Sequence, residues 1–153
     1  MKSIYLRSVT REVWECSVSL YWLFDFTKKR KDDLIGQSTY DVVVKLIVPE
    51  TIHTKCRYVD LIPSECVSTP TYFASHVWAS PFLNLVESIR QHFDYQGDEE
   101  ECKSIFIWID IFAVNQHISD NQDKDLSNLY LAVKNSELGT LVCLDTKGDL
   151  LTR

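Results

Sequence analysis

Polar side chains follow three short apolar runs of the sequence, and their types and spacing make them the candidates for chemistry. The three runs cover residues 72–75, 104–109 and 140–144. In open parallel sheets, ligands bind beyond the carboxyl ends of the strands, so the residues that follow such runs are expected to share one edge. These candidate residues are Ser75, His76, Trp78, Asp110, Asn115, Gln116 and Asp145.

Each candidate has a structural alternative. Ser75 beside His76 suggests a nucleophile and its base, but consecutive strand residues point to opposite faces, which opposes the hydrogen bond that activates a serine. Asp110 either caps the loop after its strand or contacts a ligand. Asn115 and Gln116 either bind a polar ligand through their amides or close the loop in which they stand.

Other catalytic and metal-binding patterns are missing from the sequence. No glycine loop of the form G-x-G-x-x-G or G-x-x-x-x-G-K could cradle a phosphate. The five cysteines show no C-x-x-C spacing, which favours buried free thiols in a reducing compartment over zinc or a disulfide framework. The sequence therefore predicts no metal site and identifies no catalytic residue.

The length and net charge of the chain limit the kinds of protein that it can be. A chain of 153 residues corresponds to one domain, and its net charge of −6 opposes binding to nucleic acid. The basic stretch 28–31 is followed by Asp32 and Asp33, which is typical of a solvated turn. No apolar run resembles a signal peptide or reaches 18 residues, so we expect a cytoplasmic protein that does not enter a membrane.

The first half of the chain is predicted to be largely helical. Apolar residues at helical spacing predict a helix over residues 10–26, and we expect residues 1–36 to form an N-terminal helical extension and residues 37–153 the main α/β domain. Ser38 and Asp41 predict a capping box for a helix that Pro49 ends. Residues 58–62 are predicted to form a short strand.

The second half alternates between strands and helices. Helices are predicted over residues 82–93, with Ser80 as N-cap, and over residues 126–133, with Gly139 as C-cap. Loops are expected at 98–101 and 115–124. Because these helices separate the three apolar runs, the order predicts a parallel sheet with right-handed crossovers, each strand being buried.

Two segments resemble TIR-type domains and their heterokaryon-incompatibility (HET) relatives. YFASHVWASPFLNLVESI at residues 72–89 is similar to their opening strand and helix, with the form F-x-S-H-x-W. FIWIDIFAVNQH at residues 106–117 is similar to the signature W-I-D-x-x-x-x-N-Q. The resemblance covers about residues 56–153. It implies a flavodoxin-like fold, a parallel sheet in three α/β/α layers.

This resemblance also implies a function. TIR-type domains are either signalling and immunity modules that self-associate, here with copies of the chain or with other TIR/HET-like domains, or hydrolases that cleave NAD+. A nucleotide pocket would be lined by Ser75, His76, Trp78 and the loop 110–116, with NAD+ as a substrate rather than a cofactor. Relatives continue into a helix that carries Trp-Cys and the catalytic glutamate. We therefore expect an incomplete sheet whose catalytic glutamate lies beyond Arg153.

Overall fold

The structure is a computed structural model that describes residues 10–93 and 98–144 of the 153-residue chain. Its fold is mixed α/β, as the sequence predicts. Within the described residues, five strands form one sheet in the order β2-β1-β4-β3-β5. These strands are β1 (Ser17–Ser19), β2 (Val67–Ser68), β3 (Tyr72–Ser75), β4 (Phe106–Trp108) and β5 (Thr140–Val142).

The three apolar runs lie side by side and point the same way, which confirms the predicted parallel arrangement. β3 pairs in parallel with β4, with Phe73 opposite Trp108, and in parallel with β5, with Ser75 opposite Val142. The carboxyl ends of all three strands therefore reach one edge of the sheet. The prediction that β5 is buried is wrong, because it lies at the rim and Val142 is 54% exposed.

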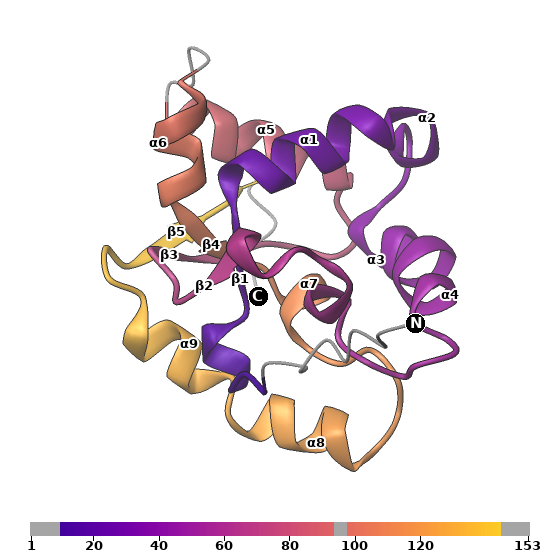
Figure 1. The fold of residues 1–153 in the computed structure, drawn as a ribbon. Helices are drawn as coiled ribbons and strands as arrows, with labels where there is room; N and C mark the ends of the chain where they lie inside the picture. The colour runs from indigo at the N-terminus through magenta and orange to yellow at the C-terminus, as the bar shows by residue number, and fades with distance from the viewer. Residues whose placement is uncertain (1–9, 94–97, 145–153) are drawn as a thin grey trace, which may run out of the picture.

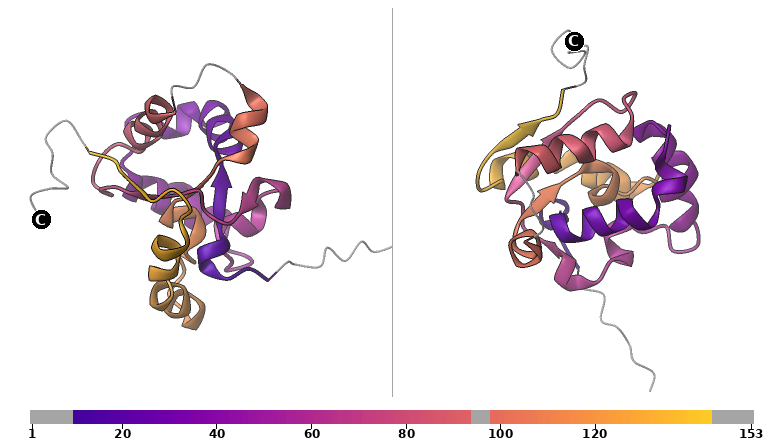
Figure 2. Two further views of the ribbon diagram at one scale, coloured as in Figure 1. Left: turned by 90° about the vertical axis from the view of Figure 1, so that its left-hand side faces the viewer. Right: turned by 90° about the horizontal axis from the view of Figure 1, so that it is seen from above.

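Helices lie on both sides of the sheet. In Figure 1, α1 (Leu20–Lys29), α5 (Phe82–His92) and α6 (Glu99–Ser104) lie above it, and α8 (Asp120–Ser127) and α9 (Tyr130–Asn135) lie below. The left-hand view of Figure 2 shows the same separation. The remaining helical elements are the 3₁₀ turns Val13–Glu15, Tyr58–Leu61 and Ser64–Cys66, the π turn Val43–Ile47, and α2 (Lys31–Leu34), α3 (Thr39–Val42), α4 (Val48–Glu50) and α7 (Asp110–Ala113).

The helix predicted over residues 10–26 exists only from Leu20 onward. β1 replaces its middle and pairs antiparallel with both β2 and β4, so the sheet is mixed rather than wholly parallel. Val18 is fully buried opposite Ile107, and the Ser19 side chain caps α1 by accepting a 3.1 Å hydrogen bond from Trp22 N. Pairing with the central strand thus outweighs the helical spacing of the apolar residues. It also joins residues 17–19 to the sheet formed by the second half of the chain.

Several local predictions need correction because polar caps form turns and helices there. Residues 58–61 are a 3₁₀ turn rather than a strand, since Asp60 Oδ2 accepts the amide of Arg57 at 3.1 Å. The acidic loop at 98–101 is the start of α6, and Asp98 caps it. In the segment 115–124, α8 begins at Asp120, and its N-cap is Ser119. The capping box of Ser38 and Asp41 is confirmed.

Helix ends also differ from the predictions. The helix that begins at Thr39 runs past Pro49 to Glu50 through a π turn at residues 43–47. α5 has Pro81 rather than Ser80 as N-cap, and its first amide, that of Phe82, donates to the Gln37 carbonyl at 3.0 Å. Gly139 does not cap α9; its φ of +103° serves the turn into β5.

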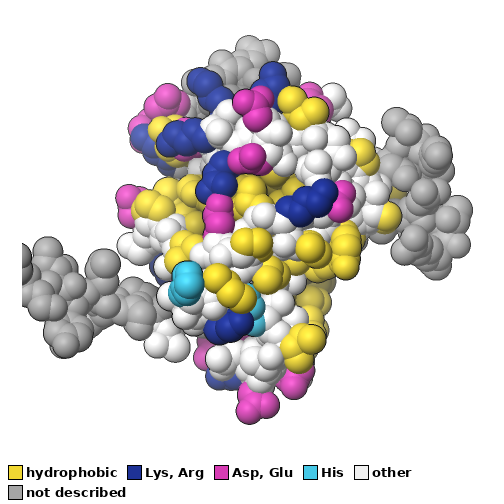
Figure 3. All heavy atoms as spheres, turned by 90° about the vertical axis from the view of Figure 1, so that its right-hand side faces the viewer, with side chains coloured by type: hydrophobic (Ala, Val, Ile, Leu, Met, Phe, Trp, Pro, Cys, Tyr) yellow, Lys and Arg dark blue, Asp and Glu magenta, His cyan; other side chains and the backbone are white. Residues whose placement is uncertain are grey.

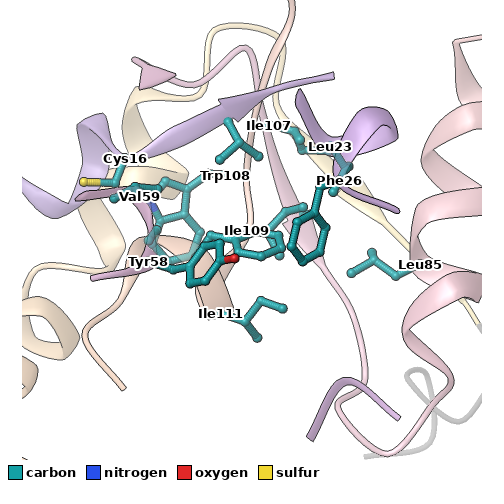
Figure 4. Close-up of a cluster of buried hydrophobic side chains, with 14 of the residues drawn as sticks. Cys16, Leu23, Phe26, Tyr58, Val59, Leu85, Ile107, Trp108, Ile109 and Ile111 are labelled. Atoms are coloured by element: carbon teal, nitrogen blue, oxygen red, sulfur yellow. The ribbon is translucent and has the colours of Figure 1, made fainter. Parts of the chain in front are cut away.

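The core lies around the central strand β4. Figure 4 shows Ile107, Trp108 and Ile109 among side chains of α1 and of the 3₁₀ turn at residues 58–61. Trp108 is fully buried, stacks on Phe73 with ring centroids 5.0 Å apart, and donates its indole N–H to the Val13 carbonyl at 2.8 Å. A buried indole needs such a partner, so this bond holds the N-terminal segment against β4.

Candidate functional site

Three of the predicted residues meet where β3 and β4 end. Asp110, the first residue of α7, follows β4, and its Oδ2 accepts a 2.7 Å hydrogen bond from Trp78 Nε1. Its Oδ1 accepts the amide of Ile111 at 2.8 Å and lies 3.6 Å from His76 Nε2. The parallel pairing of the two strands therefore brings His76, Trp78 and Asp110 together, and we call these residues the His76 cluster.

His76 has an unusual environment in this cluster. Its side chain is only 5% exposed, and its Nε2 atom has no hydrogen-bond partner among the described residues. The distance of 3.6 Å between His76 Nε2 and Asp110 Oδ1 is too long for a hydrogen bond. A buried polar atom without a partner lowers the stability of the fold by about 1–3 kcal/mol. A water molecule or ligand atom that forms a hydrogen bond with His76 Nε2 would therefore be stabilising.

A small hollow adjoins His76 on the side of β5 and α5. Its volume is about 20 Å³, and its lining includes His76, Ser80, Asn84 and Cys143. That volume is sufficient for about one water molecule. The hollow can therefore hydrate the His76 cluster, but it is too small for a nucleotide.

Ser75 contributes a main-chain hydrogen bond to the sheet. Its carbonyl accepts the amide of Cys143 at 2.8 Å, which extends the pairing of β3 with β5. No hydrogen bond between Ser75 and His76 occurs in the described part of the chain. This agrees with the alternation of side chains along a strand. Asp145, the last of the candidates, lies outside the described residues.

Asn115 and Gln116 follow Asp110 in sequence, but both amides bond to main-chain atoms. Asn115 is 3% exposed, donates to the Lys55 carbonyl at 2.7 Å and accepts the amide of His117 at 3.0 Å. Gln116 Nε2 donates to the carbonyls of Val114 and Asp110 at 3.1 and 3.3 Å. The two side chains thus hold loops in place in this structure, and ligand binding by either one stays a prediction.

An ion pair between the partly buried Arg57 and the buried Asp125 adjoins Asn115, whose main-chain amide donates to Asp125 Oδ2 at 2.9 Å, and sequence reasoning missed it. Arg57 donates from Nε and Nη2 to the two carboxylate oxygens of Asp125, at 2.9 and 2.5 Å. Burial alone would lower the pKa of Arg57, but the hydrogen bonds and charge of Asp125 outweigh it and raise that pKa. The partners are 68 residues apart, so no spacing rule could connect them.

The thiols of Cys16 and Cys143 are poorly suited to act as nucleophiles. Burial raises the pKa of the Cys16 thiol to about 12 and that of the Cys143 thiol to about 11. Since the thiolate is the reactive form, these raised pKa values keep both thiols in the less reactive protonated form at neutral pH. Across residues 10–93 and 98–144, no three His, Cys, Asp or Glu side chains gather in a way that could hold a metal ion.

Apolar side chains are also exposed on one face of the molecule. Figure 3 shows this face, on the side of α2, α3 and α4, with apolar and charged side chains interspersed. The exposed large apolar residues of this region are Ile35, Tyr40, Val44 and Ile52. None of the helices in the described part of the chain combines the length and apolar character needed to cross a bilayer.

Comparison with known proteins identifies no relative of this chain. No protein-family model matches the chain, and neither a curated protein nor a solved structure is significantly similar to it.

Proposed function

We propose that the chain is a TIR/HET-like signalling module with a flavodoxin-like arrangement, and that it acts by self-association through the open edge of β5. The parallel set β4-β3-β5 supports the proposed fold. The observation that carries the function is the edge itself, since among the described residues β5 pairs only with β3.

The backbone of β5 shows which groups are free to pair. The Gly139 carbonyl accepts from Phe73, and the Cys143 amide donates to Ser75, so these alternate residues face β3. Because backbone groups alternate along a strand, those of Thr140 and Val142 face outward. Both residues are exposed, and such an edge is a template for another strand. A second copy of the chain can supply that strand.

A matched pair of lysine substitutions tests this proposal. Val142 and Val44 have similar exposures, 54% and 48%, but Val142 is on the edge strand and Val44 is in the π turn between α3 and α4. Lysine on an edge strand opposes strand pairing. Light scattering over a concentration series should therefore show association in the wild type and in Val44→Lys, and a monomer in Val142→Lys.

The same measurement can refute the proposal. A wild-type chain that stays monomeric at every concentration would contradict self-association. Loss of association in Val44→Lys, with Val142→Lys unaffected, would place the contact on the opposite apolar face instead.

The enzyme alternative, hydrolysis of NAD+ at a pocket around Ser75, His76 and Trp78, has less structural support. The hollow beside His76 has about 20 Å³, whereas small-molecule sites commonly have about 300–1,000 Å³. Incubation with NAD+ and measurement of released nicotinamide tests this alternative. Release that disappears in His76→Ala, while that variant stays folded, would favour the enzyme over the signalling module.

A further inference from the structure

A second and larger pocket includes Asn115 in its lining and none of the residues of the His76 cluster. Its volume is about 420 Å³, and three separate segments line it: residues 10–12, residues 54–57 with Asp60, and α8 together with Asn115. A pocket of this size can hold a small metabolite. The proposed self-association does not use it. We call it the Arg57 pocket.

The ion pair of Arg57 and Asp125 is part of its wall. Asp125 is 3% exposed, and both of its oxygens accept from the guanidinium. Arg57 Nη1 also donates to the Arg11 carbonyl at 2.6 Å. Arg57 is thus neutralised, and each of its three nitrogens donates at least one hydrogen bond to the wall, so it gives the pocket rigidity rather than a free charge.

Lys55 is held in an uncommon backbone conformation at the same pocket. Its φ is +53°, the left-handed region that residues other than glycine rarely adopt. The Asn115 amide fixes the Lys55 carbonyl at 2.7 Å. Such conformations cost about 1–2 kcal/mol and persist where the surrounding structure enforces them, which includes ligand-binding loops.

Three basic side chains of the pocket have no carboxylate partner among the described residues. Lys55 and Lys124 are exposed and form no ion pair there, and the guanidinium of Arg11 donates only to the Ser64 carbonyl, at 3.3 Å. Two carboxylates, Glu12 and Asp60, also line the pocket. With Arg57 and Asp125 neutralising each other, three basic and two acidic groups remain, an excess of one positive charge in a protein of net charge −6.

We propose that the Arg57 pocket binds a small phosphorylated molecule, with the phosphate between Lys55, Lys124 and Arg11. A phosphate group carries about −1.5 to −2 charges and three acceptor oxygens, which matches several cationic donors at once. The two carboxylates can accept hydrogen bonds from hydroxyl groups of the rest of the ligand. The Asn121 amide, which also lines the pocket, can both accept from and donate to such groups.

Calorimetric titration of residues 1–153 with pyrophosphate, at constant ionic strength, tests this proposal. The double variant Lys55→Gly, Lys124→Gln removes two of the cations, and glycine at position 55 accepts the positive φ. Each charge-assisted contact is worth about tenfold in affinity or more. We therefore expect the double variant to bind pyrophosphate at least tenfold more weakly than the wild type.

The matched control is Lys28→Gln, Lys31→Gln, which removes two lysines from a different hollow, between α1 and α5. This control should bind like the wild type. Urea denaturation without ligand shows whether every variant is folded. An absence of binding by the wild type, unchanged affinity in the folded double variant, or an equal loss in the control would each overturn the proposal.

Discussion

The indole N–H of Trp78 donates to Asp110 Oδ2 at 2.7 Å and links the loop after β3 to the first turn of α7. The other carboxylate oxygen holds the amide of Ile111. Replacing Asp110 by alanine removes both acceptors and leaves the indole without this partner. Hydrogen bonds to charged groups contribute about 1.5–3 kcal/mol each, but Asp110 is 29% exposed, so water replaces part of both bonds. We therefore expect Asp110→Ala to lower the free energy of unfolding, measured in urea, by about 2–4 kcal/mol. Asp32→Ala, at an exposed position of α2, should change little, and an equal effect there would refute the role of Asp110.

The ion pair of Arg57 and Asp125 should be strongly required for stability. Removing Asp125 leaves the partly buried Arg57 side chain, which is 17% exposed, without its carboxylate partner. Asp125→Ala is therefore expected to lower the free energy of unfolding by about 2–3 kcal/mol, less than for a fully buried pair. Adding Arg57→Met should recover part of this loss, because no charge is then left unpaired. The exposed pair of Lys29 and Asp25 is the control, and Asp25→Ala should have no comparable effect in the same denaturation experiment. A double variant that is less stable than Asp125→Ala would contradict this account.

His117 should make stability depend on pH. Burial, followed by the nearby charge of Lys55, lowers the pKa of His117 below its ordinary value of 6.5. Below about pH 6.5 the unfolded chain takes up a proton that the folded chain resists, so the free energy of unfolding falls until the pH passes the lowered pKa of the folded chain. Above that window His117 is neutral in both states and has no effect on the pH dependence.

Urea denaturation of the wild type and of His117→Gln between pH 7.5 and pH 5 measures this contribution. The variant should lose less stability on acidification than the wild type. His53→Gln, at an exposed position, is the control and should follow the wild-type slope. Parallel slopes for the wild type and His117→Gln would exclude His117 as the cause.

Gly139 should tolerate no side chain without a loss of stability. A Cβ atom at this position would meet nothing within 4 Å, so space is not the restriction. The φ of +103° is the restriction, because residues with a side chain rarely adopt it. Gly139→Ala is therefore expected to lower the free energy of unfolding by about 1–2 kcal/mol. Circular dichroism during thermal unfolding measures the effect, and an unchanged midpoint would show that the turn before β5 can rearrange.

Local chemistry in the sequence was enough to predict the elements that depend on neighbouring residues. The runs that became β3, β4 and β5 are short and apolar and are separated by amphipathic helices, which requires a parallel arrangement. The buried face of α5 and the capping box of Ser38 and Asp41 followed from spacing alone. Placing His76 and Asp110 at one edge followed from the direction of the strands, although their actual contact did not.

The tertiary structure decided whatever depends on residues far apart in the chain. β1 forms because Val18 can pair with Ile107, and this long-range pairing outweighs a local helical pattern. Arg57 meets Asp125 across 68 residues, and that contact turns a loop and a helix into the wall of a pocket. The sequence carries no local sign of either contact, because a buried partner is chosen by the fold and not by the spacing of side chains along the chain.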